Sequence, residues 1–174
     1  MSKAFVGIVM GSDSDLELMA GAAKVLTELG VESEMRVLSA HRVPEDLVKW
    51  IRDAEQRGCK AFIAGAGMAA ALPGTLAAHT SLPVIGIPLT SSSSALGGLD
   101  ALLSIVQMPP GVPVATVGLN GSKNAGVLAA QILAAGDEAL AKNVGAYKEK
   151  QAKDVLAKDA KLQEKGYKKY LEEK

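Results

Sequence analysis

Apolar runs alternate along the chain with stretches in which apolar residues recur at helical spacing. Residues 4–10 form an almost continuous apolar run, which is typical of a strand buried on both faces. From Ser14 the apolar positions follow a helical stripe until Gly30, and glycine is favoured just after a helix ends. The same alternation predicts further strands at residues 32–38, 60–64, 83–87 and 113–117, and further helices at residues 44–57, 74–79, 96–106 and 123–156.

Strands that alternate with helices of this length predict an α/β domain with a parallel sheet, right-handed crossovers and helices on both faces. We assign residues 1–157 to this single domain, and we expect its last helical segment to be interrupted near Gly136 and Gly145. Residues 158–174 are rich in Lys and Glu and are expected to form a solvated helix or a frayed terminus. Ligands of such folds bind at the carboxyl ends of the strands, where the strand order reverses.

Charge and composition exclude several classes of partner. The 19 basic residues are balanced by 19 acidic ones, and the chain has two Phe, one Trp and three Tyr. A nucleic-acid partner is therefore not expected, since binding many phosphates needs a surplus of Lys and Arg. Neither a basic-then-apolar leader nor a run of about 18 apolar residues is present, and Cys59 has no second cysteine to pair with. These features predict a cytoplasmic protein without a membrane segment.

Polar residues are concentrated in the loops that follow the predicted strands. Hydroxyl groups and free backbone N–H groups at a helix N-terminus favour an anion, and an arginine can bind a phosphate through two hydrogen bonds. Asp15 could accept hydrogen bonds from a vicinal diol such as a ribose. The alternative for the first loop is structural, with Ser12 or Ser14 capping the helix. The candidate anion-binding residues are Ser12, Ser14, Asp15, Ser39 and Arg42.

His41 is the candidate for proton transfer. It is one of two histidines in the chain and lies beside Arg42, directly after a predicted strand. Histidine can give or take a proton near neutral pH. The other histidine, His79, lies at the end of a predicted helix, where a cation is mildly stabilising, and we interpret it as structural.

A glycine-rich loop follows the third predicted strand. Gly65, Gly67 and Ala70 match the spacing of a dinucleotide fingerprint, but the acidic residue expected about 20 positions later is absent, and Pro73 and Gly74 are expected to interrupt the helix that the motif should open. We therefore interpret this loop as one that lets a small ligand approach the backbone closely. The sequence predicts no metal site, no cofactor and no serine-hydrolase elbow.

Together, these loops resemble the PurE family of purine biosynthesis, which comprises N5-carboxyaminoimidazole ribonucleotide mutases and the related aminoimidazole ribonucleotide carboxylases. The resemblance covers about residues 4–156 and rests on five ordered motifs, which are Gly-Ser-x-Ser-Asp at residues 11–15, Ser-Ala-His-Arg at 39–42, Ala-Gly-Ala-Gly at 64–67, Leu-Pro-Gly at 72–74 and Ser-Ile-Val-Gln-Met-Pro at 104–109. It implies a flavodoxin-like α/β/α sandwich, a homo-octamer and C-terminal helices that pack across subunits.

The resemblance also implies roles for the loop residues. His41 is then the general acid/base. In the implied reaction the substrate loses its N-carboxylate as CO2, the enzyme retains this CO2, and carbon 4 of the imidazole takes it up. Ser12, Asp15 and Arg42, assisted by Ser39, are expected to bind the ribose 5-phosphate. The full set expected to contact the ribonucleotide is Ser12, Ser14, Asp15, Ser39, Arg42, Gly65, Ala66, Gly67 and Leu72.

Two positions depart from the usual mutase pattern. Met68 stands where a glycine is usual, and Ala71 stands where a histidine is usual. The sister carboxylases use free CO2, but their loop is shorter, so the mutase is the favoured prediction and the carboxylase the alternative. A second alternative is a flavodoxin-like nucleotide- or FMN-binding module without turnover, although aromatic residues to stack a flavin are scarce. A third is a scaffold protein that acts through its C-terminal helices.

Overall fold

The computed structural model describes residues 4–90, 94 and 96–173. Its centre is a five-stranded sheet in the order β2-β1-β3-β4-β5, and each pair of neighbouring strands is parallel. The strands are β1 (Phe5–Met10), β2 (Glu32–Val37), β3 (Cys59–Gly67), β4 (Val84–Leu89) and β5 (Ala115–Thr116). The helices are the 3-10 turn η1 (Asp13–Asp15), α1 (Leu16–Leu29), α2 (Pro44–Gln56), α3 (Leu72–His79), α4 (Leu99–Val106), α5 (Ser122–Ala134) and α6 (Glu138–Glu172).

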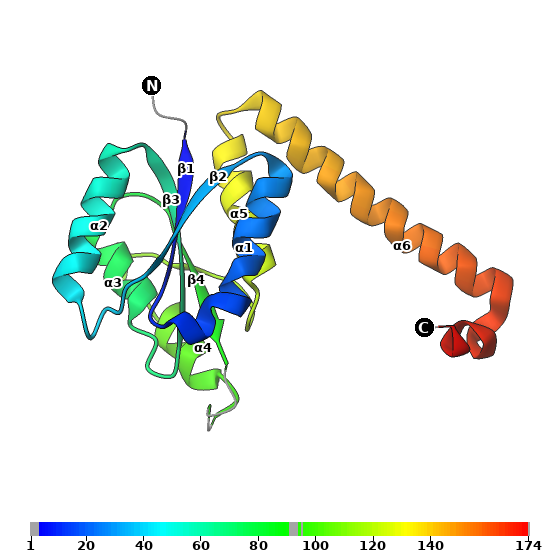
Figure 1. Cartoon of the computed structure of the whole chain (residues 1–174), viewed down its shortest axis with the longest axis horizontal. Coiled ribbons are helices and arrows are strands. Elements are labelled where there is room, and N and C mark those ends of the chain that lie inside the picture. The colour runs from blue at the N-terminus through cyan, green and yellow to red at the C-terminus, as the bar shows by residue number, and fades with distance from the viewer. Residues whose placement is uncertain (1–3, 91–93, 95, 174) are drawn as a thin grey trace.

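Helices cover both faces of the sheet, as predicted. In Figure 1, α1 and α5 lie on one face and α2 and α3 on the other. Every residue of β1 and β4 is buried, because each of these strands packs against helices on both sides. One core cluster joins the sheet to α1, α5 and the start of α6, and a second joins it to α2 and α3. The α/β/α sandwich expected from the sequence is therefore confirmed.

The helix boundaries predicted from glycine and proline are largely correct. Gly30 ends α1 with φ 82°, and its N–H donates to the carbonyls of Leu26 and Thr27. Gly58 follows α2 with φ 100°, and Pro44 occupies the first turn of that helix. Positive φ is strained for residues with a Cβ, which explains why glycine stops both helices.

Three predicted details are wrong. Pro73 and Gly74 do not interrupt a helix, because α3 begins at Leu72 and accommodates Pro73 in its first turn, where a missing N–H costs nothing. Gly145 lies inside α6, although the break near Gly136 is present between α5 and α6. The predicted helix at residues 96–106 begins only at Leu99, because Gly97 and Gly98 have φ values of 60° and 90°.

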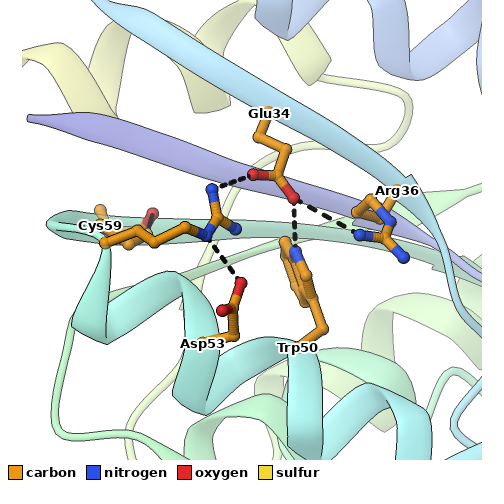
Figure 2. Close-up of polar contacts among 7 residues, drawn as sticks. Glu34, Arg36, Trp50, Asp53 and Cys59 are labelled. Atoms are coloured by element: carbon orange, nitrogen blue, oxygen red, sulfur yellow. Dashed lines mark hydrogen bonds and ion pairs between the residues drawn. The ribbon is translucent and has the colours of Figure 1, made fainter. Parts of the chain in front are cut away.

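A polar network holds α2 against the edge strand β2 (Figure 2). The Trp50 indole donates to Glu34 Oε1 at 2.8 Å, and Arg57 Nη1 pairs with Glu34 Oε2 at 2.6 Å. The Trp50 ring also meets Phe62 edge to face, with centroids 5.3 Å apart. The half-buried Glu34 therefore links the strand before the His41 loop to the helix after it.

Helix α6 leaves the body and projects away from it (Figure 1). Its buried residues, Leu140, Val144 and Tyr147, all lie in its first three turns. The helix continues through residues 158–172, with non-helical angles at Gly166, so the charged tail is helical in the structure. Among the described residues, no helix is long and apolar enough to cross a membrane.

Candidate active site

Four loops meet at the carboxyl edge of the sheet, the lower end in Figure 1. Strand β1 pairs with β2 on one side and β3 on the other, so the strand order reverses at β1, where ligands of this topology bind. The loops after β1, β2, β3 and β4 surround a cleft of about 550 Å³. The cleft is lined by Gly11, Ser12, Ser14, Asp15, Ser39, Ala40, His41, Arg42, Ala66, Gly67, Met68, Ala69, Ala71, Leu72, Leu89, Thr90 and Ser94.

Two other hollows are of similar volume. One of about 640 Å³ lies along α2, and one of about 610 Å³ lies between the end of α1 and the start of α6. Neither gathers residues from the carboxyl ends of several strands. The loop cleft is therefore the site that the fold itself provides for a ligand.

The loop after β1 caps its own helical turn and also faces the cleft. Ser12 Oγ accepts from the Ser14 N–H at 3.3 Å and from Ser14 Oγ at 2.9 Å. Of the two serines considered as caps, Ser12 is therefore the one that caps the turn η1. Both serines also line the cleft. The two interpretations of this loop are thus compatible, because a hydroxyl group has both donor and acceptor capacity.

Asp15 follows in the same turn, and its carboxyl group makes no capping hydrogen bond. Burial raises the pKa of Asp15 above its ordinary value, because a charged carboxylate loses hydration there. Asp15 lines the cleft. A partly dehydrated acceptor gains more from a ligand hydroxyl than an exposed one does.

Arg42 ties the loop after β2 to the loop after β1. Its Nη2 donates to the Gly11 carbonyl at 2.6 Å, while the Ser39 carbonyl accepts from the N–H groups of Arg42 and Val43. A guanidinium has five N–H donors, so this tether leaves donors for an anion in the cleft. The neighbouring His41 is exposed and lines the same cleft.

The glycine-rich loop contributes in two ways. Ala66, Gly67 and Leu72 line the cleft as predicted, whereas Gly65 does not and is buried beneath it. A Cβ at Gly65 would collide with the Met19 sulfur and lie 3.0 Å from Leu89 Cδ1. Gly65 is therefore required by packing under the cleft.

The two positions that depart from the mutase pattern also line the cleft. Met68 has φ 55°, the left-handed region that suits the glycine usual there, and its side chain is 62 % exposed. Ala71 places only a methyl group where the imidazole is usual. His41 is accordingly the only histidine among the described residues that line the cleft.

Sequence analysis missed Asn120, which follows β5 and supports Thr90 at the cleft wall. Asn120 Oδ1 accepts from the Thr90 N–H at 2.9 Å, and Asn120 Nδ2 donates to Thr90 Oγ1 at 2.7 Å. The Asn-Gly pair at residues 120–121 is a turn signal that could have marked the position. Its contact with Thr90 spans 30 residues and could not be predicted from local sequence.

The described residues offer neither a metal-binding cluster nor a reactive thiol at this site. Within the part of the chain that the structure describes, no three His, Cys, Asp or Glu side chains are grouped to hold a metal ion. Cys59 is buried at the start of β3, at the opposite edge of the sheet from the cleft. Burial raises the pKa of the Cys59 thiol, which keeps it protonated and unreactive.

Comparison with known proteins shows the family to which the chain belongs. A family model described as AIR carboxylase matches residues 5–154. The chain belongs to the AIR carboxylase family. It is 52% identical over 169 residues to the N5-carboxyaminoimidazole ribonucleotide mutase of Thermotoga maritima, covering 97% of this chain and 98% of that protein. It is 56% identical over 167 residues to the protein of the same name from Pyrococcus abyssi, covering 96% of this chain and 95% of that protein.

Other relatives carry the carboxylase name or share the fold. The chain is 50% identical over 172 residues to the phosphoribosylaminoimidazole carboxylase of Candida glabrata, covering 99% of this chain but 30% of that longer protein. The crystal structure of Treponema denticola PurE superposes with a TM-score of 0.82 at 32% identity, covering 92% of this chain and 99% of that one. The PurE resemblance inferred from the loop motifs is confirmed, as is the α/β fold.

Proposed function

We propose that this chain converts N5-carboxyaminoimidazole ribonucleotide to 4-carboxyaminoimidazole ribonucleotide in purine biosynthesis. The observation that carries the proposal is the match along nearly the whole chain to relatives named as this mutase. The cleft supports it, because its lining combines an arginine, hydroxyl groups and one histidine. These groups fit a phosphorylated substrate and a reaction that moves a proton.

We assign the phosphate, the ribose and the imidazole of the substrate each to the residues of the cleft whose chemistry suits it. Arg42 supplies charge-assisted hydrogen bonds to the 5-phosphate, and Ser12, Ser14 and Ser39 place further hydroxyl groups in the same cleft. Asp15 accepts from the ribose hydroxyls. Ala66, Gly67 and Leu72 form an apolar wall against the imidazole, over the packing that Gly65 permits.

His41 serves as general acid and then as general base. Breaking the bond between the exocyclic nitrogen and its carboxylate releases CO2, and the nitrogen takes up a proton from the His41 imidazolium. Carbon 4 of the imidazole then attacks the CO2, forming the new carbon–carbon bond. The tetrahedral carbon returns a proton to His41, so protons balance over the cycle. This reaction sequence needs no cofactor. The CO2 has to stay near carbon 4 between the two steps, and the cleft brings the groups that act on it together.

The test supplies purified protein with one of two substrates. We expect 4-carboxyaminoimidazole ribonucleotide to form from N5-carboxyaminoimidazole ribonucleotide at low concentration, without added bicarbonate. Formation only from aminoimidazole ribonucleotide with bicarbonate would instead assign the carboxylase activity named for the Candida glabrata relative. Binding of nucleotide without either conversion would support the non-catalytic module.

We further propose that the enzyme works in the cytoplasm as a homo-octamer that binds a ribonucleotide and CO2. Unpaired apolar surface supports assembly, since Leu99, Leu103 and Val106 are each about half exposed on α4. They recur at positions i, i+4 and i+7, so they share one helix face. Light scattering coupled to gel filtration measures the assembly, and a monomer would refute it.

A further inference from the structure

Asn120 holds an unusual backbone conformation next to the candidate active site. Its φ is 54°, and Met68 is the only other residue with a Cβ that has positive φ in the described part of the chain. Its N–H donates to the Pro88 carbonyl at 2.9 Å, and its own carbonyl accepts from the Ser122 N–H at 2.9 Å. Left-handed backbone costs a non-glycine residue energy, and the surrounding structure has to maintain it. A residue kept in this conformation despite its cost suggests that the Asn120 side chain has a function that glycine could not supply.

Both ends of the Asn120 amide contact one residue, Thr90. The oxygen accepts from the Thr90 backbone N–H at 2.9 Å, and the nitrogen donates to the Thr90 hydroxyl at 2.7 Å. An amide used at both ends fixes both the main chain and the side chain of its partner. Thr90 is the first residue after β4, so the amide controls where the chain leaves the sheet.

Thr90 also contacts the start of α4. A Cβ at Gly98 would collide with the Thr90 methyl carbon and lie 2.9 Å from Leu119 Cδ2. Gly98 also has φ 90° and precedes α4, so the start of that helix rests directly against Thr90. The half-buried Thr90 therefore contacts both the start of α4 and the Asn120 turn.

Thr90 lines the cleft, and Asn120 does not. The strand order places the β4 loop across β1 and β3 from the β2 loop that carries His41. We propose that Asn120 is a positioning residue, which acts through Thr90 to hold the cleft wall facing His41 in its working position. The inference rests on the proposed function and adds to it a residue outside the cleft lining. Sites held by such supporting hydrogen bonds keep reacting groups aligned.

The test compares four variants in the assay described above. Asn120→Gly removes both hydrogen bonds and suits the left-handed backbone, so it separates loss of the contact from backbone strain. We expect kcat/KM to fall by roughly tenfold, the size expected for losing a hydrogen bond. Thr90→Val keeps the backbone N–H that bonds to Asn120 and removes only the hydroxyl contact, so it should cause a smaller loss than Asn120→Gly. Thr90→Ser keeps the hydroxyl and should lose less than Thr90→Val. The double variant Asn120→Gly/Thr90→Val should lose little more than Asn120→Gly alone, because Asn120→Gly already removes the hydroxyl contact that Thr90→Val removes.

Thr80→Val is the matched control. Thr80 Oγ1 accepts a hydrogen bond from the Leu82 N–H at 3.0 Å and donates one to the Glu55 carboxylate. Thr80 precedes β4, so it lies at the edge of the sheet opposite the cleft. We expect Thr80→Val to lower the melting temperature without changing kcat/KM. A wild type without mutase activity would refute the proposed function. An active wild type with unchanged kcat/KM in Asn120→Gly, or fully additive losses in the double variant, would overturn the inference alone.

Discussion

His41 and Arg42 are adjacent in sequence but suited to different tasks. Arg42 is tethered to the Gly11 carbonyl and its guanidinium only donates hydrogen bonds, whereas an imidazole such as that of His41 has two ring nitrogens that can donate or accept a proton. Binding and proton transfer are therefore separable by substitution at neighbouring positions of one loop.

We expect His41→Asn to lower kcat by about 100-fold or more while nucleotide affinity is largely retained, because a general acid/base contributes about that much. Steady-state kinetics and equilibrium binding of the nucleotide measure the two effects. His79→Asn is the matched control, since His79 ends α3 away from the cleft lining. Unchanged turnover in His41→Asn would refute the assigned role.

We expect Asp15 to affect both the stability of the folded protein and the binding of the nucleotide. Burial raises its pKa above 3.8 in the folded protein, so the folded state holds the proton more tightly than the unfolded state. Stability is then lost as pH rises from about 3.8 through the folded pKa, and the cost is fully present at neutral pH. Asp15→Asn should therefore raise the melting temperature at pH 7, with the gain disappearing below pH 4.

The same variant should bind nucleotide more weakly, with KM raised roughly tenfold, because a charged acceptor is lost. Thermal unfolding at the two pH values and steady-state kinetics measure both effects. Asp13→Asn, at an exposed neighbour that does not line the cleft, is the control. A lower melting temperature for Asp15→Asn at pH 7 would contradict this interpretation.

At the level of elements, Glu34 connects β2 to α2, the strand and helix that flank the His41 loop. Burial alone would raise the pKa of Glu34, but hydrogen bonds from Arg57 and Trp50 and the charges of Arg57 and Arg36 together lower it. A lowered pKa in the folded state adds stability above the ordinary value of 4.5. That stability is lost as pH falls through the folded pKa.

Glu34→Gln should therefore lower the free energy of unfolding by about 1–2 kcal/mol at pH 7, because two charge-assisted hydrogen bonds are weakened. The difference from wild type should shrink as pH falls below 4.5. Urea unfolding at several pH values, followed by the fluorescence of Trp50, measures it. Glu149→Gln, on the exposed surface of α6, should show neither effect. A loss that stays constant with pH would show that the charge of Glu34 is not its cause.

At the level of the whole molecule, the contacts of α6 with the body that the described residues show lie in the first half of this helix. Leu140, Val144 and Tyr147 pack into the core, and Asn143 Nδ2 donates to the Leu29 carbonyl at 3.1 Å. Farther along, Val155 and Leu156 are 63 % and 66 % exposed. The start of α6 therefore belongs to the folding unit, whereas residues 158–174 are a proposed appendage.

A chain that ends at Ala157 should keep the free energy of unfolding of the body within about 0.5 kcal/mol, since surface changes rarely cost more. A chain that ends at Asp137 should lose at least about 3 kcal/mol, because it removes three large buried side chains. Urea unfolding followed by Trp50, which is 4 % exposed, reports on the body. Equal losses in the two truncations would place residues 158–174 inside the folding unit.

The local sequence determined most of the elements and the identity of the loop residues. Apolar runs marked the buried strands, and Gly30 and Gly58 marked helix ends, because hydrophobic periodicity and backbone sterics act over a few residues. The motifs around Ser12, His41 and Arg42 placed these residues after strands, and parallel topology then required their loops to share one edge of the sheet.

Only the tertiary structure decided how these loops are supported. Gly65 lies under the cleft because Met19 and Leu89 pack against it, and Asn120 reaches Thr90 across 30 residues. The Gly145 break was wrong because a helix can tolerate a glycine at a modest cost. Close packing and hydrogen bonds between distant segments depend on the positions of all the elements at once, and no local pattern encodes them.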